Sequence, residues 1–96
     1  MSKPIYRLDA SLVQDLRVCT VHAHNGDEIG LTPRQKVIAR VICRLTPRQR
    51  ECLYLYYGRG ASMGDIAWMM EVRTSTVSRN IQNGMRHIQA ALELIE

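Results

Sequence analysis

The sequence predicts an all-α domain whose clearest helices lie after residue 31. Three observations predict this fold class. Residues 31–35 and 45–49 both read Leu-Thr-Pro-Arg-Gln, a segment typical of a helix start. Apolar residues in the same part of the chain recur at helical spacing, and strand signals are almost absent. With 96 residues, the chain is long enough for one hydrophobic core and too short for a second.

The first 30 residues are predicted to form an N-terminal extension, partly ordered, that precedes a helical domain over residues 31–96. Leu8, Leu12 and Leu16 are spaced four apart and predict a short amphipathic helix near residues 9–18. The segment 18–21 is then rich in β-branched residues, and Asn-Gly-Asp at 25–27 is a turn signal. A small hairpin is therefore an alternative for this region.

Two helices are predicted to begin at the repeated segments. In each, Thr caps the helix, Pro fits its first position, and Gln three residues after Thr completes a capping box. Two copies fourteen residues apart are too few for a repeat fold. Gly-Arg-Gly at 58–60 ends the second helix. The two helices carry apolar stripes, which comprise Val37, Ile38, Val41 and Ile42 in the first and Cys52, Leu53, Tyr56 and Tyr57 in the second.

Two more helices follow. Ser62, with Asp65 three residues later, starts a third helix over residues 63–70. A break at 71–74 leads to a long last helix over about residues 75–95. This helix has a stripe of six apolar residues at helical spacing, namely Val77, Ile81, Met85, Ile88, Leu92 and Ile95.

Residues 63–82 match the twenty-residue helix-turn-helix pattern. Its two helices cross steeply, so the middle of the first needs a small residue, here Ala67. The turn commonly holds Gly, and Glu71 stands there instead, which implies a non-Gly residue at positive φ. Apolar residues occupy the positions expected to be buried, namely Ile66, Met70, Val72, Val77 and Ile81. Polar residues occupy the outward positions, namely Asp65, Arg73, Ser75, Ser78, Arg79 and Gln82.

The charge is concentrated in the helical part. The chain has a net charge of +4, but residues 31–86 carry ten basic and three acidic residues, a balance of +7. Eleven of the thirteen basic residues are Arg, whose guanidinium suits phosphates and base edges. This balance points toward nucleic acid, although charge alone is equally consistent with a solvated surface.

The block from residue 45 to 92 resembles region four of bacterial sigma-70-type factors. It is also similar to the DNA-binding domains of response regulators typified by quorum-sensing activators, and to small regulators of signal-recognition-particle operons. The resemblance implies a winged-helix-like or sigma-region-four type of domain with one or two extra helices before it. Promoter melting is not implied, because the chain is too short for that region of a sigma factor. The segments that carry the resemblance are Leu45-Thr46-Pro47-Arg48-Gln49-Arg50-Glu51, the Leu-Tyr-Tyr run, Ser62-Met63-Gly64-Asp65-Ile66-Ala67 and Thr76-Val77-Ser78-Arg79.

The resemblance implies a sequence-specific DNA-binding transcriptional regulator whose last helix enters the major groove of double-stranded DNA. Arg79 would contact guanine and Gln82 would contact adenine. Arg48, Arg50 and Arg59 flank the unit and would contact phosphates. The alternative explanation of these polar residues is a solvent-exposed helix face that binds no ligand. The residues that match exposed recognition positions are Arg73, Thr74, Ser75, Ser78, Arg79 and Gln82.

A different class of function is an interaction module that docks on RNA polymerase or a regulatory partner, with Trp68 and Met69 as the contact. Packing of this pair against residues 1–44 is the favoured interpretation of its position. We also expect a homodimer, because one helix-turn-helix contacts few base pairs. Its surface would come from the distal Leu92 and Ile95, or from Leu12, Leu16, Val37 or Val41.

Other classes are not expected. No nucleophile lies in a recognisable setting, no Gly-rich phosphate loop precedes a helix, and carboxylates are scattered, so we predict no enzyme and no cofactor. Cys19, His22 and His24 lie close together but lack a fourth ligand, so no metal site is predicted. No apolar run is long enough to cross a membrane and the first four residues lack a secretory signal, so a cytoplasmic location is expected.

Overall fold

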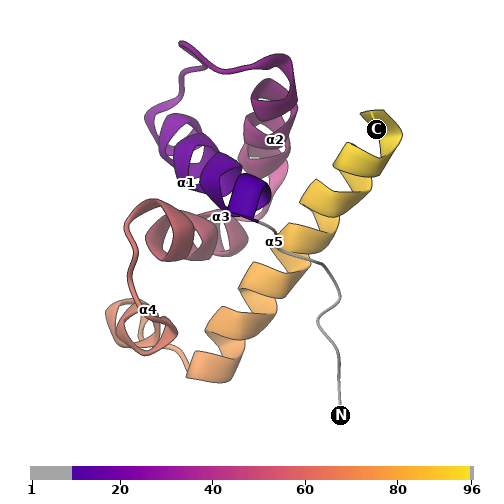
Figure 1. The fold of residues 1–96 in the computed structure, drawn as a ribbon. Coiled ribbons are helices and arrows are strands. Elements are labelled where there is room, and N and C mark those ends of the chain that lie inside the picture. Colours follow the sequence, from indigo (N-terminus) through magenta and orange to yellow (C-terminus); the bar gives the residue numbers. More distant parts are fainter. Residues whose placement is uncertain (1–9, 96) are drawn as a thin grey trace.

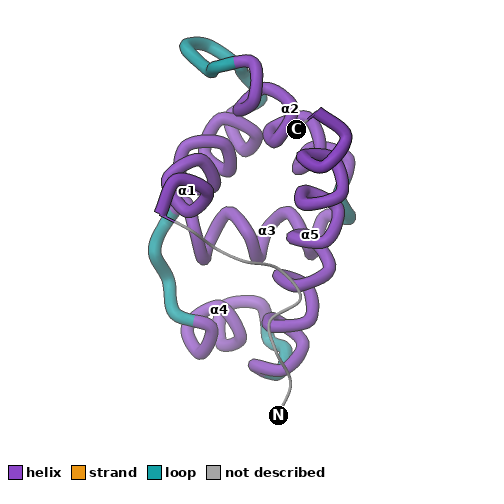
Figure 2. The backbone as a smooth tube through the Cα atoms, turned by 45° about the vertical axis from the view of Figure 1, so that its right-hand side comes forward, coloured by secondary structure: helices purple, strands orange, loops and turns teal. Residues whose placement is uncertain are grey.

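The computed structural model describes residues 10–95 and confirms the all-α fold class (Figure 1). No strand occurs in this part of the chain, so no β wing accompanies the helices (Figure 2). None of the helices between residues 10 and 95 combines the length and apolar content that a bilayer crossing needs. The elements are α1 (Ala10–Asn25), α2 (Pro33–Arg44), α3 (Pro47–Leu53), a π-helical turn η1 (Tyr54–Gly58), α4 (Met63–Met70) and α5 (Thr74–Ile95).

The two repeated segments start α2 and α3 as predicted, each with a complete capping box. Before α2, the Gln35 amide N–H donates to the Thr32 hydroxyl at 3.1 Å, and the Thr32 N–H donates to the Gln35 side-chain oxygen at 3.0 Å. Before α3, the equivalent distances between Thr46 and Gln49 are 3.2 and 3.3 Å. Two N–H groups that a helix start leaves without partners are therefore satisfied at each site.

Helix α1 is longer than predicted, and the hairpin alternative for residues 18–27 is wrong. The helix continues to Asn25 because Cys19, Thr20 and Ala23 are buried against neighbouring elements. The Thr20 hydroxyl donates to the Leu16 carbonyl at 2.7 Å, which satisfies a polar group inside the core. Gly26, at φ 78°, then ends the helix. Leu8 and Asp9, where the predicted helix begins, lie outside the described residues.

One core joins all the helices. Helix α1 packs against α2 and η1, while α5 packs against α2, α3 and α4. Two glycines allow the closest approaches. A Cβ at Gly84 of α5 would lie 2.8 Å from Cδ1 of Leu53, and a Cβ at Gly58 of η1 would lie 2.9 Å from the Thr20 hydroxyl oxygen. These contacts hold α5 against α3 and α1 against η1.

The helix that begins at the second repeated segment ends at Gly58, where the sequence predicts, but its last turn is a wider π-helical turn. Helix α3 runs directly into η1, whose last turn is closed by the Arg59 N–H donating to the Tyr54 carbonyl at 3.0 Å. Gly60 then adopts φ 73°, and the Ala61 N–H donates to the Leu55 carbonyl at 2.9 Å. The chain is thereby turned toward α4.

Glu71 occupies the left-handed position between α4 and α5, at φ 56° and ψ 45°. We expect Glu71→Gly to raise the free energy of unfolding by about 0.5–1 kcal/mol. A side chain in this region costs about 1–2 kcal/mol, and the greater freedom of glycine in the unfolded chain offsets part of the gain. Urea denaturation of the variant measures the difference.

The matched control for this prediction is Glu71→Ala, which removes the carboxylate and keeps the Cβ. It should give no comparable gain, because the backbone remains strained. Equal gains from the Ala and Gly variants would attribute the effect to the lost charge and contradict the backbone explanation.

Candidate nucleic-acid interface

Helices α4 and α5 form the predicted helix-turn-helix unit. Helix α4 spans Met63–Met70 as predicted, and α5 begins at Thr74, one residue before the predicted start. Ala67 is buried at the crossing, and the Val72 N–H donates to its carbonyl at 3.0 Å. The Ser62 hydroxyl accepts from the Asp65 N–H at 3.1 Å and caps α4. The unit is thus held by a small residue, a cap and a tight turn.

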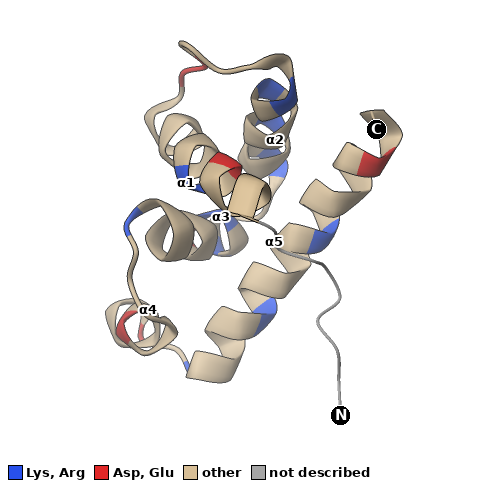
Figure 3. Ribbon diagram, in the orientation of Figure 1, with Lys and Arg blue, Asp and Glu red and all other residues tan. Residues whose placement is uncertain are grey.

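Helix α5 has one buried and one exposed face. The buried face carries five of the six residues of the predicted stripe, of which Val77, Ile81 and Met85 are almost fully enclosed. The sixth, Ile95, is 51% exposed at the end of the helix. The opposite face carries Ser75, Arg79 and Gln82, all exposed and spaced four and three residues apart. In Figure 3 the basic residues of α5 lie on the side away from the other helices. We call Ser75, Arg79, Gln82 and Arg86 the outer face of α5.

The beginning of α5 favours negative groups. Its first turn has no acidic residue, and the Arg73 and Thr74 side chains are exposed beside it. The N-terminus of a helix carries a partial positive charge and N–H groups without intrahelical partners. A phosphate placed there would therefore meet two sources of positive potential, the helix end and the Arg73 guanidinium.

A hydrogen bond to a neighbouring residue of α5 orients one side chain of the outer face. The Gln82 side-chain amide donates to the Ser78 hydroxyl at 3.2 Å, and Ser78 itself is half-buried. The Arg79 guanidinium forms no ion pair with any residue between 10 and 95. Arg79 is therefore the cation of this face that is available to a ligand near the start of the helix.

The three predicted phosphate contacts come from other elements. Arg48 is exposed on α3, and Arg59 is exposed between η1 and α4. Arg50 is half-buried, and one guanidinium nitrogen donates to the Cys43 carbonyl at 3.1 Å. That bond places a cation at the C-terminal end of α2, where the helix dipole favours positive charge. Arg50 therefore has a structural contact in addition to its predicted role.

Sequence reasoning missed one residue of the outer face, Arg86. It also predicted the wrong surroundings for two residues of α4, Trp68 and Met69. Arg86 is exposed seven residues after Arg79, two helical turns along the same face, and this spacing was a usable signal. Packing of Trp68 and Met69 against the described part of residues 1–44 is wrong, because their side chains are 82% and 48% exposed. Helix α1 instead packs against α2 and η1 and leaves α4 uncovered.

The residues considered as metal ligands have other partners. The Cys19 thiol donates to the Gln35 carbonyl, and burial, with the nearby Asp15 carboxylate, raises the pKa of this thiol to about 12. His22 pairs with Asp27, and His24 stacks on the Tyr54 ring at 3.8 Å between centroids. Between residues 10 and 95, no group of three His, Cys, Asp or Glu residues is arranged to hold a metal ion.

Comparison with known proteins identifies the family of this unit. The family model described as Sigma-70, region 4 matches residues 41–90, from the last turn of α2 through most of α5. It covers the helix-turn-helix unit and the outer face of α5. The chain has no match among curated proteins or among solved structures. Because the match spans just over half of its length, the chain belongs to the sigma-70 region 4 family, whose members are DNA-binding helix-turn-helix domains of transcription.

Proposed function

We propose that this protein is a sequence-specific DNA-binding transcriptional regulator that inserts the first turns of α5 into the major groove. The observation that supports this best is the outer face of α5, which is exposed, polar and basic at a helix end that attracts phosphates. The major groove of B-DNA is about 12 Å wide and admits one helix. The core stripe on the opposite side of α5 holds that helix in place.

Within this proposal, the side chains of α5 divide into readers and anchors. Arg79 contacts guanine with two hydrogen bonds, and Gln82, oriented by Ser78, contacts adenine. Thr74 and Ser75 offer hydroxyls at the helix start, and Arg73 neutralises a phosphate there. Arg48, Arg50 and Arg59 contact the DNA backbone on either side. Specificity then depends mainly on two residues of α5.

The experiment that tests the proposal is selection of bound sequences from a random DNA pool. We expect a short motif to be enriched, and affinity for it to fall steeply as salt rises, because phosphate contacts release counterions. A pool that stays random after repeated selection, with no binding at low salt, would contradict the proposal. Because the pool holds every short sequence, the same experiment tests for binding and identifies the target site.

The exposed Trp68–Met69 pair favours a second candidate function, docking on RNA polymerase or on a regulatory partner without specific DNA binding. Two results together would support it. Polymerase would be recovered with the protein from a lysate, and no DNA band shift would occur at low salt. Recovery of polymerase with an intact DNA shift would instead fit a regulator that uses both surfaces.

We further propose that the regulator acts as a homodimer on paired half-sites about one helical turn apart. Of the surfaces suggested by the sequence, Leu12, Leu16 and Leu92 are buried in the core and do not qualify. Val37 and Val41 of α2 are half-buried, and Ile95 is 51% exposed. The end of α5 around Ile95 is the most exposed of these surfaces and is therefore the better candidate for contact between copies on paired half-sites.

A further inference from the structure

Helix α4 presents an aromatic residue flanked by carboxylates. Trp68 is the most exposed apolar residue of this helix, with Met69 beside it. Asp65 lies three residues before Trp68 on the same side of α4, and Glu71 follows directly after the last residue of the helix. Neither carboxylate forms an ion pair with the part of the chain that the structure describes. We call Asp65, Trp68, Met69 and Glu71 the acidic Trp68 face.

The charge of this face opposes contact with DNA. Helix α4 itself contains no Lys or Arg, and both carboxylates are exposed. Phosphates would be repelled from the position at which the indole points outward. An exposed Trp is among the residues that contribute most when a protein surface covers it. The acidic Trp68 face therefore fits a partner with an apolar surface bordered by cations.

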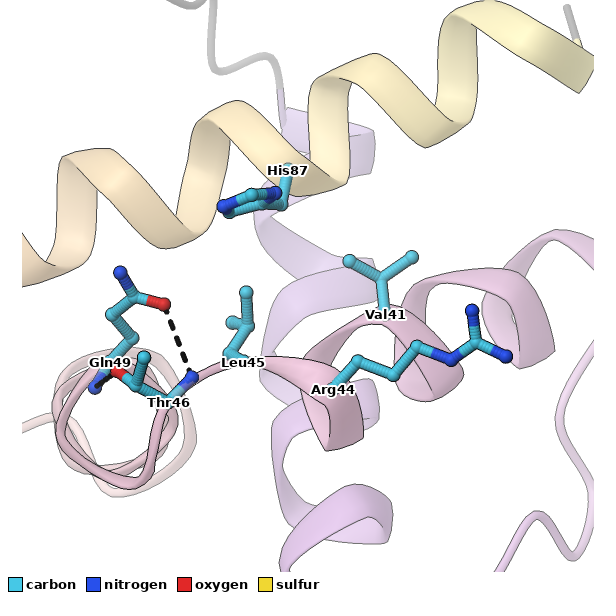
Figure 4. Close-up of a pocket in the computed structure, with 6 residues that line it drawn as sticks. All are labelled: Val41, Arg44, Leu45, Thr46, Gln49 and His87. Carbon is cyan, nitrogen blue, oxygen red and sulfur yellow. Dashed lines mark hydrogen bonds between the residues drawn. The ribbon is translucent and has the colours of Figure 1, made fainter.

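Such a surface exists along α2. Two adjoining pockets of about 320 and 240 Å³ share Val41 and Arg44. In Figure 4, Val41 points toward α5, and His87 extends from α5 toward Leu45. We call the combined hollow the basic α2 groove. Its other lining residues are Val37, Arg40, Leu45, Thr46, Gln49 and His87.

Arg44 is the cation of this groove that is open to a partner. The Arg40 guanidinium donates two hydrogen bonds to the Glu28 carboxylate, at 2.8 and 3.0 Å. Arg44 is exposed and forms no ion pair with residues 10–95. An incoming carboxylate would therefore pair with Arg44 while an apolar group rests on Val41.

We propose that the acidic Trp68 face docks into the basic α2 groove of a second copy of this chain. The two surfaces are complementary in charge and both offer apolar contact. They cannot meet within one molecule, because α4 and α2 lie at different ends of it and do not pack together (Figures 1 and 2). Trp68 lies against Val37 and Val41 in the complex, and Asp65 pairs with Arg44.

This contact is heterologous, since different surfaces of the two copies meet. It needs neither DNA nor the outer face of α5, so it goes beyond the proposed function and is tested without DNA. Its success or failure is therefore independent of DNA binding. Salt should weaken it, because exposed charges are screened.

The first test uses the intrinsic fluorescence of Trp68, the only tryptophan of the chain. We expect its emission to shift to shorter wavelength as protein concentration rises, in step with an increase in mass measured by sedimentation. If the emission wavelength of Trp68 remains that of an exposed indole at every protein concentration, the proposal is overturned. An increase in mass without an emission shift would overturn it as well, because the copies would then meet elsewhere.

The second test uses charge reversal. Asp65→Arg and Arg44→Asp should each weaken self-association about tenfold or more, and an equimolar mixture of the two variants should restore it, since each supplies the surface that complements the other. Arg17→Asp, an exposed position on α1, is the matched control and should leave association unchanged. A mixture that associates no better than either variant would overturn the proposal.

Circular dichroism checks that the charge-reversal variants fold. Trp68→Ala is a third variant, chosen because it should fold like the parent chain. The Trp68 side chain is mostly exposed, so its removal leaves the core intact. This variant should also weaken self-association about tenfold or more, as removal of a central interface Trp usually does. Association equal to that of the parent chain would overturn the proposal.

Discussion

Leu16→Ala is expected to lower the free energy of unfolding by about 2–5 kcal/mol, the usual cost of removing a buried Leu side chain. Leu16 has no exposed surface and belongs to the same core cluster as Ile38 and Ile42 of α2. Its truncation loses apolar burial and leaves a cavity that the surrounding helices fill only in part. Because small domains have about 5–15 kcal/mol of stability in total, the loss would be a large share.

Urea denaturation followed by circular dichroism measures this loss. Gln14→Ala is the matched control, since Gln14 is exposed on the same helix and its replacement should change stability by no more than about 0.5 kcal/mol. A Leu16→Ala loss as small as that of the control would mean that α1 contributes little to the core. Residues 1–30 would then behave as the partly ordered N-terminal extension that the sequence suggested.

The helix starts were predictable because their signals are local. A capping box needs only a Thr, a Pro and a Gln at fixed spacing, and both copies form the expected hydrogen bonds. Ser62 and the apolar periodicity gave α4 its observed bounds in the same way. Glu71 was predicted to lie at positive φ from its place in the helix-turn-helix pattern, and it does.

Features that depend on distant contacts were not predictable. The β-branched residues at 18–21 favour strand on propensity, but burial of Cys19 and Thr20 against α2 and η1 keeps the segment helical. The π-helical turn after Leu53 has no sequence signal that we recognise. Whether Trp68 would be covered depended on the position of α1, which the local pattern does not determine.

In the candidate site, too, features with a local sequence pattern were predictable and features that depend on packing were not. Six residues were expected at exposed recognition positions. Ser78 is half-buried, and the other five side chains are exposed, namely Arg73, Thr74, Ser75, Arg79 and Gln82. Their contacts with DNA remain predictions. The pattern ended at residue 82, and so it passed over Arg86. Similarly, the bond from Arg50 to the Cys43 carbonyl joins α3 to the end of α2 and follows from their packing rather than from a motif.

Arg79→Ala is expected to weaken binding to the selected DNA site by about 1–3 kcal/mol, or about 5- to 150-fold. Loss of two hydrogen bonds to guanine removes discrimination at one base pair, so preference there should relax. Binding to random DNA should fall less, since it depends on phosphate contacts made by several other Arg residues. Fluorescence anisotropy with the selected site, with that site altered at single base pairs, and with random DNA measures all three quantities.

Arg17→Ala is the control for this last measurement, because it removes the same charge from an exposed position on α1, a helix that packs mainly against α2 and η1. If net charge alone governed binding, the two substitutions would weaken binding to the selected site and binding to random DNA equally. If Arg79 reads a base, only Arg79→Ala changes the ratio between them. An unchanged ratio for Arg79→Ala would remove this residue from the recognition surface and would move the assignment of specificity to Gln82 or Arg86, its neighbours on the outer face of α5.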